Sequence, residues 1–145
     1  MLAPNGQGVS VWVHNATYGG RTITPSEYVK LCCGAPQNTV PLEIWGQGSG
    51  FSRIPDGLDF ASGTIEEASL LRWGEMDLED PTSRDFQEFN RKLGEAEADG
   101  WLLANNPRIK TAIWYGPEPL PTTGRGAQLT RLLASHGIQY QLVIP

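Results

Sequence analysis

The segment that most restricts the fold of this chain is RIPDGLDFASGTIEEASLL, residues 53–71. Its pattern predicts two strands joined by a tight turn at 61–63, and the second strand is apolar at both ends but acidic in the middle. Neighbouring strand residues point to opposite faces of a sheet, so only one of Glu66 and Glu67 can face any single site. In the first strand, Asp56 follows a proline at a bend. The segment therefore sets two acid-bearing strands side by side.

Asp56 and Glu67 are the pair with the clearest chemical meaning. Carboxylates on neighbouring strands can converge on one hard divalent cation, such as Mg²⁺ or Mn²⁺, which prefers oxygen ligands. A cation held there orients a water molecule, lowers its pKa and offsets negative charge on a phosphate under attack. Two plainer interpretations stay open. Asp56-Gly57 is also a hairpin-turn signal, and both glutamates could be solvent-facing charges that protect an edge strand from aggregation.

The sequence on either side predicts further helices and strands. A helix begins at Thr24, where Pro25 suits the first turn and Glu27 stands at capping-box spacing, and Gly34 ends it. The other predictions are a weak strand over 9–13 ended by a turn region at 15–20, strands over 42–45, 51–60, 63–71, 108–115 and 138–144, and helices over 80–99 and 125–135. This order predicts one α/β (α+β) domain over residues 1–145, with a mixed central β-sheet flanked by helices.

The composition narrows the class of protein. The chain has 16 acidic and 11 basic residues and a formal net charge of −5, which disfavours tight nonspecific binding to DNA but suits carboxylates around a cation, or a basic partner. No apolar run reaches the roughly 18 residues of a membrane span. The first residues lack a signal-peptide pattern, so we expect synthesis in the cytoplasm. Cys32 and Cys33 are adjacent, and we expect both to stay free.

The motif around the hairpin resembles the PD-(D/E)XK superfamily, in particular the nuclease domains of restriction-endonuclease-like fold at the ends of bacterial polymorphic toxins. The Pro-Asp step of the family falls on Pro55-Asp56, and its acidic-x-Lys strand falls on Glu67-Ala68-Ser69. The resemblance covers most of the chain, because the order of the predicted elements also follows the family. It implies a restriction-endonuclease-like fold and a metal-dependent nuclease that hydrolyses phosphodiester bonds in DNA or RNA.

The resemblance also implies roles for individual residues. Asp56 and Glu67 would hold Mg²⁺ or Mn²⁺, and Glu27 on the first helix would add a third carboxylate. The side chains that would line the phosphate site are Ser69, Arg72 and Gln87. The implied partners are a nucleic-acid substrate and a cognate immunity protein, with the domain exported as the toxin end of a larger effector and active in the cytoplasm of a target cell.

This chain departs from the family at Ser69, which stands where the family has a lysine. The chain contains Lys30, Lys92 and Lys110, and none of them lies in the motif. In the family, that lysine positions the attacking water and offsets developing charge; a serine has no charge for this, and Arg72 is a poor proton acceptor. Two alternatives therefore stay open. One is an inactive member of the same fold, by natural or engineered loss of the lysine, that acts as a binding domain. The other is an immunity or adaptor protein whose acidic surface covers a basic partner.

Overall fold

A computed structural model describes residues 16–18, 20–34, 37–46 and 50–145. Its central sheet has the strand order β5-β6-β7-β8, in which β5 runs antiparallel to β6 while β6, β7 and β8 run parallel. In chain order the elements are β1 (Ala16–Tyr18), β2 (Arg21–Ile23), α1 (Pro25–Cys33), β3 (Leu42–Glu43), β4 (Ser52–Arg53), β5 (Gly57–Asp59), β6 (Thr64–Ala68), the 3₁₀ helix η2 (Trp73–Glu75), α2 (Arg84–Asn105), β7 (Thr111–Gly116), α3 (Ala127–His136) and β8 (Gln139–Leu142).

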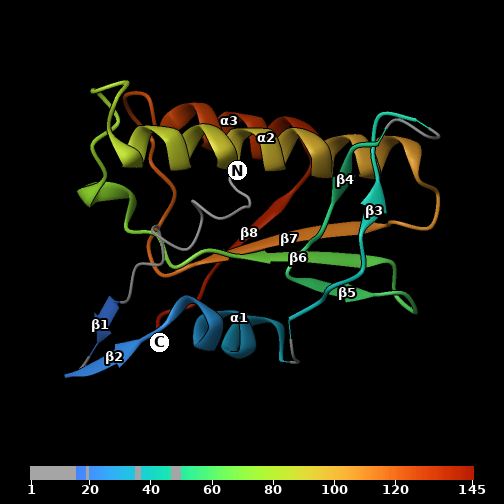
Figure 1. Ribbon diagram of the computed structural model, residues 1–145, viewed down its shortest axis with the longest axis horizontal. Coiled ribbons are helices and arrows are strands. Elements are labelled where there is room, and N and C mark those ends of the chain that lie inside the picture. The colour runs from blue at the N-terminus through green and yellow to red at the C-terminus, as the bar shows by residue number, and fades with distance from the viewer. Residues whose placement is uncertain (1–15, 19, 35–36, 47–49) are drawn as a thin grey trace.

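The helices lie on both faces of this sheet, with α1 on one face and α2 and α3 together on the other (Figure 1). Each of the two parallel pairings needs a crossover between its strands, and α2 and α3 provide these crossovers. The main core fills the space between the sheet and α2 and α3, and its most deeply buried side chains are Ile65, Phe89, Leu102, Trp114, Leu129 and Leu133. The predicted mixed sheet flanked by helices is confirmed.

The start of α1 has the predicted capping box. Glu27 N–H donates to Thr24 Oγ1 at 3.1 Å, and Glu27 Oε1 accepts the Thr24 N–H at 2.9 Å. At the other end, Gly34 adopts the left-handed conformation (φ 69°) that ends the helix, as predicted. Cys32 and Cys33, in the last turn, are both free thiols. Local chemistry therefore fixes both ends of this helix.

The strand predicted over 51–60 is split in two. Its first part, β4, pairs with β3 in a separate small sheet, and its second part, β5, pairs with β6. The break falls at Pro55-Asp56, because proline has no N–H to donate to a sheet ladder. β5 pairs with β6 only as far as the Gly57–Glu66 contact. The last two residues of β6 thus extend beyond β5, and Asp56 lies where the two strands part.

Other boundaries differ by a few residues. α2 begins at Arg84 rather than near residue 80, because the Ser83 hydroxyl caps the helix by accepting the Phe86 N–H, and it continues to Asn105 rather than stopping near 99. Residues 16–18 form β1, although the sequence predicts a turn region there. The strand predicted over 9–13 lies outside the described residues. Among the described residues, no helix is long and apolar enough to cross a membrane.

Candidate functional site

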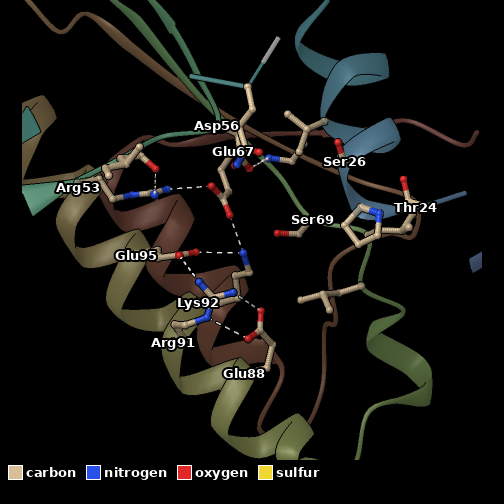
Figure 2. Close-up of a pocket in the computed structure, with 17 residues that line it drawn as sticks. Thr24, Ser26, Arg53, Asp56, Glu67, Ser69, Glu88, Arg91, Lys92 and Glu95 are labelled. Atoms are coloured by element: carbon tan, nitrogen blue, oxygen red, sulfur yellow. Dashed lines mark hydrogen bonds and ion pairs between the residues drawn. The ribbon is translucent and has the colours of Figure 1, made fainter. Parts of the chain in front are cut away.

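The Asp56 and Glu67 carboxyl groups meet where β5 parts from β6 (Figure 2). Asp56 Oδ2 accepts the N–H of Ala68 at 2.9 Å, so this side chain takes a β6 donor beyond the last residue paired with β5. Asp56 Oδ1 accepts a hydrogen bond from Gln37 Nε2 at 3.1 Å. The Asp56 carboxyl group lies beside the Glu67 carboxylate, close enough for the negative charge of Glu67 to raise the Asp56 pKa. The hairpin thus brings together the two acids that the sequence predicts as a pair.

Two cations hold the Glu67 carboxylate. Lys92 Nζ, from α2, lies 2.5 Å from Glu67 Oε2, and Arg53 Nη2 lies 3.1 Å from Glu67 Oε1. Glu67 is only 5% exposed and Lys92 only 4%, so this interaction is shielded from water. A buried carboxylate with charge-assisted bonds to both oxygens has a fixed orientation. Glu67 is therefore a positioned anion rather than a solvated charge on an edge strand.

The contacts continue on both sides of Glu67 as a chain of alternating charge. On one side, Arg53 Nε bonds Asp99 Oδ1 at 2.8 Å, and Asp99 Oδ2 accepts the indole N–H of Trp114 at 2.8 Å. On the other side, Lys92 Nζ bonds Glu95 Oε1 at 3.0 Å. We call the run Asp99, Arg53, Glu67, Lys92 and Glu95 the buried charge chain. It links the core of the sheet to the surface of α2.

The outer end of this chain reaches solvent along α2. Arg91 bonds Glu95 at 2.7 Å and Glu88 at 2.6 Å, and its side chain is 44% exposed. Figure 2 shows Lys92 and these three side chains together on α2, beside the pocket. Polar residues at this spacing fall on one face of a helix. The face of α2 that meets Glu67 is thus charged, whereas its neighbouring face carries the apolar core.

Burial and charge set the acidities of the two carboxyl groups in opposite directions. Burial, followed by the negative charge of Glu67, raises the pKa of Asp56 to about 7. Burial also opposes ionisation of Glu67, but the Lys92 ammonium and the Arg53 guanidinium outweigh it and hold the Glu67 pKa well below its usual range. The pKa of Lys92 is raised because the charges of Glu67 and Glu95 outweigh its burial. Glu67 is therefore ionised at neutral pH, while Asp56 is close to its midpoint.

These groups open onto a pocket of about 540 Å³ between α2 and the start of α1. Ser69 also lines it, one residue beyond β6, held by a hydrogen bond from its N–H to the Tyr115 carbonyl at 3.0 Å. Ser69 is 6% exposed, and its hydroxyl has no hydrogen-bond partner within the part of the chain that the structure describes. Figure 2 shows this hydroxyl pointing into the pocket. Asp56, Glu67 and Ser69 thus share one cavity.

Three side chains that the resemblance assigns to the site lie elsewhere. Glu27 is turned back onto Thr24 in the capping box and does not line the pocket. Arg72 bonds Glu75 at 3.2 Å, and its guanidinium lies 4.9 Å from the centre of the Tyr18 ring. The predicted roles of Glu27 and Arg72 at the site therefore find no support in the geometry.

Gln87 is the third of them. It is exposed on α2 and lies one residue before Glu88, which lines the pocket. Gln87 lies on the flank of the face that Glu88 and Lys92 share, and it is not among the residues that line the pocket. The order of residues in the sequence does not by itself show which face of this helix meets the hairpin.

Sequence reasoning missed both cations that bond Glu67, Arg53 and Lys92. Lys92 is the more distant of the two along the chain. It stands 25 residues after Glu67 and therefore falls outside any local motif. A signal was nevertheless present. Acidic and basic residues recur along α2 at spacings of three and four, at positions 88, 91, 92, 95 and 99. Charges at this spacing most often mark a solvent-exposed face, so they indicate a charged face of α2 without singling out Lys92 as buried.

Asp56 and Glu67 are the side chains of this pocket that could hold a hard divalent cation. Two carboxyl groups that repel one another in a pocket would be relieved by a cation between them, and Mg²⁺ is commonly held by one or two carboxylates with water completing its shell. Among the described residues, no group of three or more His, Cys, Asp or Glu side chains is placed to hold a metal ion. Asp56 and Glu67 would then be the protein ligands, with water or substrate oxygens as the others. No known protein family, curated protein or solved structure matches this chain.

Proposed function

We propose that this chain is a metal-dependent nuclease domain of restriction-endonuclease-like fold, which hydrolyses phosphodiester bonds in DNA or RNA with Mg²⁺ or Mn²⁺. The observation that carries the proposal is the meeting of the Asp56 and Glu67 carboxyl groups in one pocket, with the Lys92 ammonium on Glu67. The resemblance implies two acidic metal ligands with a lysine beside them. Here Asp56 and Glu67 are the two acids, and the lysine beside them comes from α2 instead of the strand that carries Glu67.

The order of the elements supports the same proposal. A helix precedes the Pro55-Asp56 bend, an antiparallel strand pair carries the two acids, and α2 then leads to a strand parallel to β6. This is the order expected from the resemblance. The topology alone does not select a chemistry, because one fold serves many functions. The side chains in the pocket supply that part of the argument.

Each residue of the pocket has a distinct task in this proposal. Asp56 and Glu67 would hold the cation, which lowers the pKa of a bound water and offsets charge on the phosphate. Lys92, at 2.5 Å from Glu67 Oε2, places a second positive charge beside the same carboxylate and takes the place of the lysine that is absent at Ser69. Arg53 holds the other oxygen of Glu67 and keeps that carboxylate ionised and oriented.

Cleavage assays test this proposal directly. The purified protein is incubated with plasmid DNA, and separately with RNA, in Mg²⁺ or Mn²⁺, beside Asp56→Ala and Glu66→Gln variants. We expect the wild type and Glu66→Gln to cleave and Asp56→Ala to lose activity by about a hundredfold or more. Glu66 is the matched control, since it neighbours Glu67 but does not line the pocket. Equal cleavage by all three proteins, or no cleavage by the wild type with either metal, rejects the proposal.

A second candidate function is a binding domain of the same fold that does not cleave. The observation that favours it is that Arg53 and Lys92 already hold both oxygens of Glu67, which leaves the carboxylate satisfied without a metal. Calorimetric titration with Mg²⁺ and Mn²⁺ separates the two candidates. A nuclease binds the metal through Asp56 and loses it in Asp56→Ala, whereas a non-catalytic domain gives no metal-binding heat in either protein.

The toxin context belongs to the leading proposal and has its own test. Expression of the chain inside a bacterial host should arrest growth, whereas Asp56→Ala expressed to the same level should not. An immunity protein would then be identified as a partner that restores growth. Normal growth with abundant, correctly folded wild-type protein would count against a toxin and would favour the binding domain or an adaptor protein with a basic partner.

A further inference from the structure

The pocket has a second end that is lined by hydroxyl groups instead of ion pairs. Thr24 and Ser26, at the start of α1, and Ser69, just after β6, line this end (Figure 2). The cations at the other end, Lys92 and Arg53, are already bonded to carboxylates. Any anion that enters the pocket therefore finds its uncommitted hydrogen-bond donors at the hydroxyl end.

The first turn of α1 has one backbone donor to offer. Glu27 N–H donates to Thr24 Oγ1 at 3.1 Å, Tyr28 N–H donates to the Thr24 carbonyl at 3.0 Å, and Pro25 has no N–H. For the N–H of Ser26, no acceptor is found among the described residues. Unpaired N–H groups and the positive end of the helix dipole favour an anion at such a position. The Ser26 hydroxyl adds a second donor beside it.

Ser69 gives an independent reason to expect a ligand here. Its side chain is only 6% exposed, and its hydroxyl points into the pocket without a partner within the described residues. A buried hydroxyl that makes no hydrogen bond is destabilising, so most such groups are paired. A ligand oxygen at this end of the pocket would pair with it.

We propose that Ser69, together with the N–H and hydroxyl of Ser26 at the start of α1, forms a subsite that binds a phosphate group of a nucleic-acid strand. The inference rests on the proposed function and assigns that phosphate a place next to the carboxylate pair. It also replaces Arg72 and Gln87, which the resemblance assigns to the phosphate, with residues that line the pocket.

The subsite depends on the metal for an electrostatic reason. Four acids, Asp56, Glu67, Glu88 and Glu95, line the same pocket as three bases, so the pocket offers an incoming phosphate no net positive charge. A divalent cation between Asp56 and Glu67 would make that end of the pocket positive. The hydroxyl and N–H donors then fix where the phosphate oxygens lie, while the cation supplies most of the attraction.

Binding of a fluorescein-labelled thymidine oligonucleotide, followed by fluorescence anisotropy, tests the subsite. Ca²⁺ replaces Mg²⁺ so that binding is measured apart from cleavage. The variants are Ser69→Ala, Ser26→Ala and Ser69→Thr, which keeps a hydroxyl. The control is Ser135→Ala on α3, whose hydroxyl bonds the Leu132 carbonyl away from the pocket. Calorimetry gives the Ca²⁺ affinity of each protein without the oligonucleotide, and amide NMR follows the Ser26 N–H.

We expect Ser69→Ala to weaken oligonucleotide binding by about tenfold, the effect of losing a hydrogen bond to a charged group, with Ca²⁺ affinity unchanged. Ser26→Ala should weaken it less, because the N–H remains, while Ser69→Thr and Ser135→Ala should match the wild type. The Ser26 amide signal should shift on addition of the oligonucleotide. Wild-type protein that binds Ca²⁺ and oligonucleotide, with Ser69→Ala binding equally well, overturns the subsite alone. Wild-type protein that binds no divalent cation overturns the proposed function, and the subsite with it.

Discussion

Glu66 and Glu67 are neighbours on β6, and the two faces of the sheet place them in different surroundings. Glu66 lies on the α1 side, where its Oε2 accepts a hydrogen bond from the Tyr115 hydroxyl at 2.5 Å. Glu67 lies on the α2 side, bonded by Lys92 and Arg53. Only Glu67 lines the pocket. On the α1 face, Glu66 bonds a single hydroxyl. On the α2 face, Glu67 stands at the centre of the buried charge chain.

The difference shows how a sheet directs chemistry to one side. Alternation along β6 sends successive side chains to opposite faces, so the surroundings of each glutamate are decided by the helix packed on that face. The α1 face of the sheet carries a mainly apolar cluster that includes Tyr28, Cys32 and Tyr115, whose hydroxyl bonds Glu66. α2 offers Glu67 a stripe of charges. The candidate site therefore depends as much on the face of α2 as on the strand motif.

The largest effect we expect is the difference in stability between Glu67→Gln and Glu66→Gln. Glu67→Gln removes the carboxylate that both Lys92 and Arg53 bond, and both cations stay buried. The free energy of unfolding should therefore fall by about 3 kcal/mol. Glu66→Gln keeps a hydrogen-bond acceptor for Tyr115 and should cost about 1 kcal/mol or less. Urea unfolding followed by circular dichroism measures both. Equal losses would mean that the two faces do not differ in this way.

A reciprocal exchange tests whether Lys92 takes the place of the missing motif lysine. Lys92→Met alone should lower cleavage of plasmid DNA by about a hundredfold, because a positive charge next to the reacting phosphate is lost. Adding Ser69→Lys to that variant returns a lysine to the strand and should recover a substantial part of the activity. Unfolding curves for both proteins show whether they are folded.

The outcome that would contradict this role is specific. If the folded double variant stays as inactive as Lys92→Met, position 69 and position 92 are not interchangeable, and Lys92 acts only as a structural partner of Glu67. If Lys92→Met remains folded and fully active, the ammonium has no part in cleavage at all.

The sequence predicts the hairpin, its acids and the layout of helices well, because those features depend on local alternation, capping and turn residues. Thr24, Glu27 and Gly34 mark α1 without reference to any distant residue. It does not predict the partners of Glu67, because Arg53 and Lys92 reach that carboxylate only after the strands and α2 have packed. The resemblance places a lysine at position 69, and no local rule points 23 residues further along the chain to Lys92.

Asp56 is predicted to make stability depend on pH. Its pKa is raised to about 7 by burial and by Glu67, against a usual value of 3.8. The folded protein therefore holds a proton that the unfolded chain has lost, and the stability this provides is present at low pH and disappears as the pH rises through about 7. Asp56→Asn mimics the protonated acid and does not titrate. Relative to the wild type, its stability should grow by about 2 kcal/mol between about pH 5 and pH 8.

Thermal or urea unfolding in metal-free buffer across this pH range measures the effect. Asp59→Asn is the matched control, because Asp59 is exposed at the end of β5, where the Ser62 hydroxyl and the Ala61 N–H lower its pKa. That variant should gain no stability relative to the wild type as the pH rises. A constant difference between Asp56→Asn and the wild type across the range would show that Asp56 is ionised throughout.

The smallest effect we expect separates the stabilising and positioning roles of the buried charge chain. Arg53→Met alone leaves Asp99 buried without its cation, so the double variant Arg53→Met/Asp99→Asn is the informative one, because an amide oxygen can still accept the Trp114 indole N–H. Removing both charges of a buried ion pair is often tolerated, so this protein should fold. Its Glu67 carboxylate, however, has lost the group that orients one oxygen, and Mn²⁺ affinity should fall by about tenfold, as for other residues that orient metal ligands.

Calorimetric titration measures that affinity. Arg91→Met, which removes a cation from α2 without touching Glu67, should leave the Mn²⁺ affinity unchanged. Unaltered Mn²⁺ binding by a stable double variant would mean that Lys92 and the packing of β6 orient Glu67 on their own.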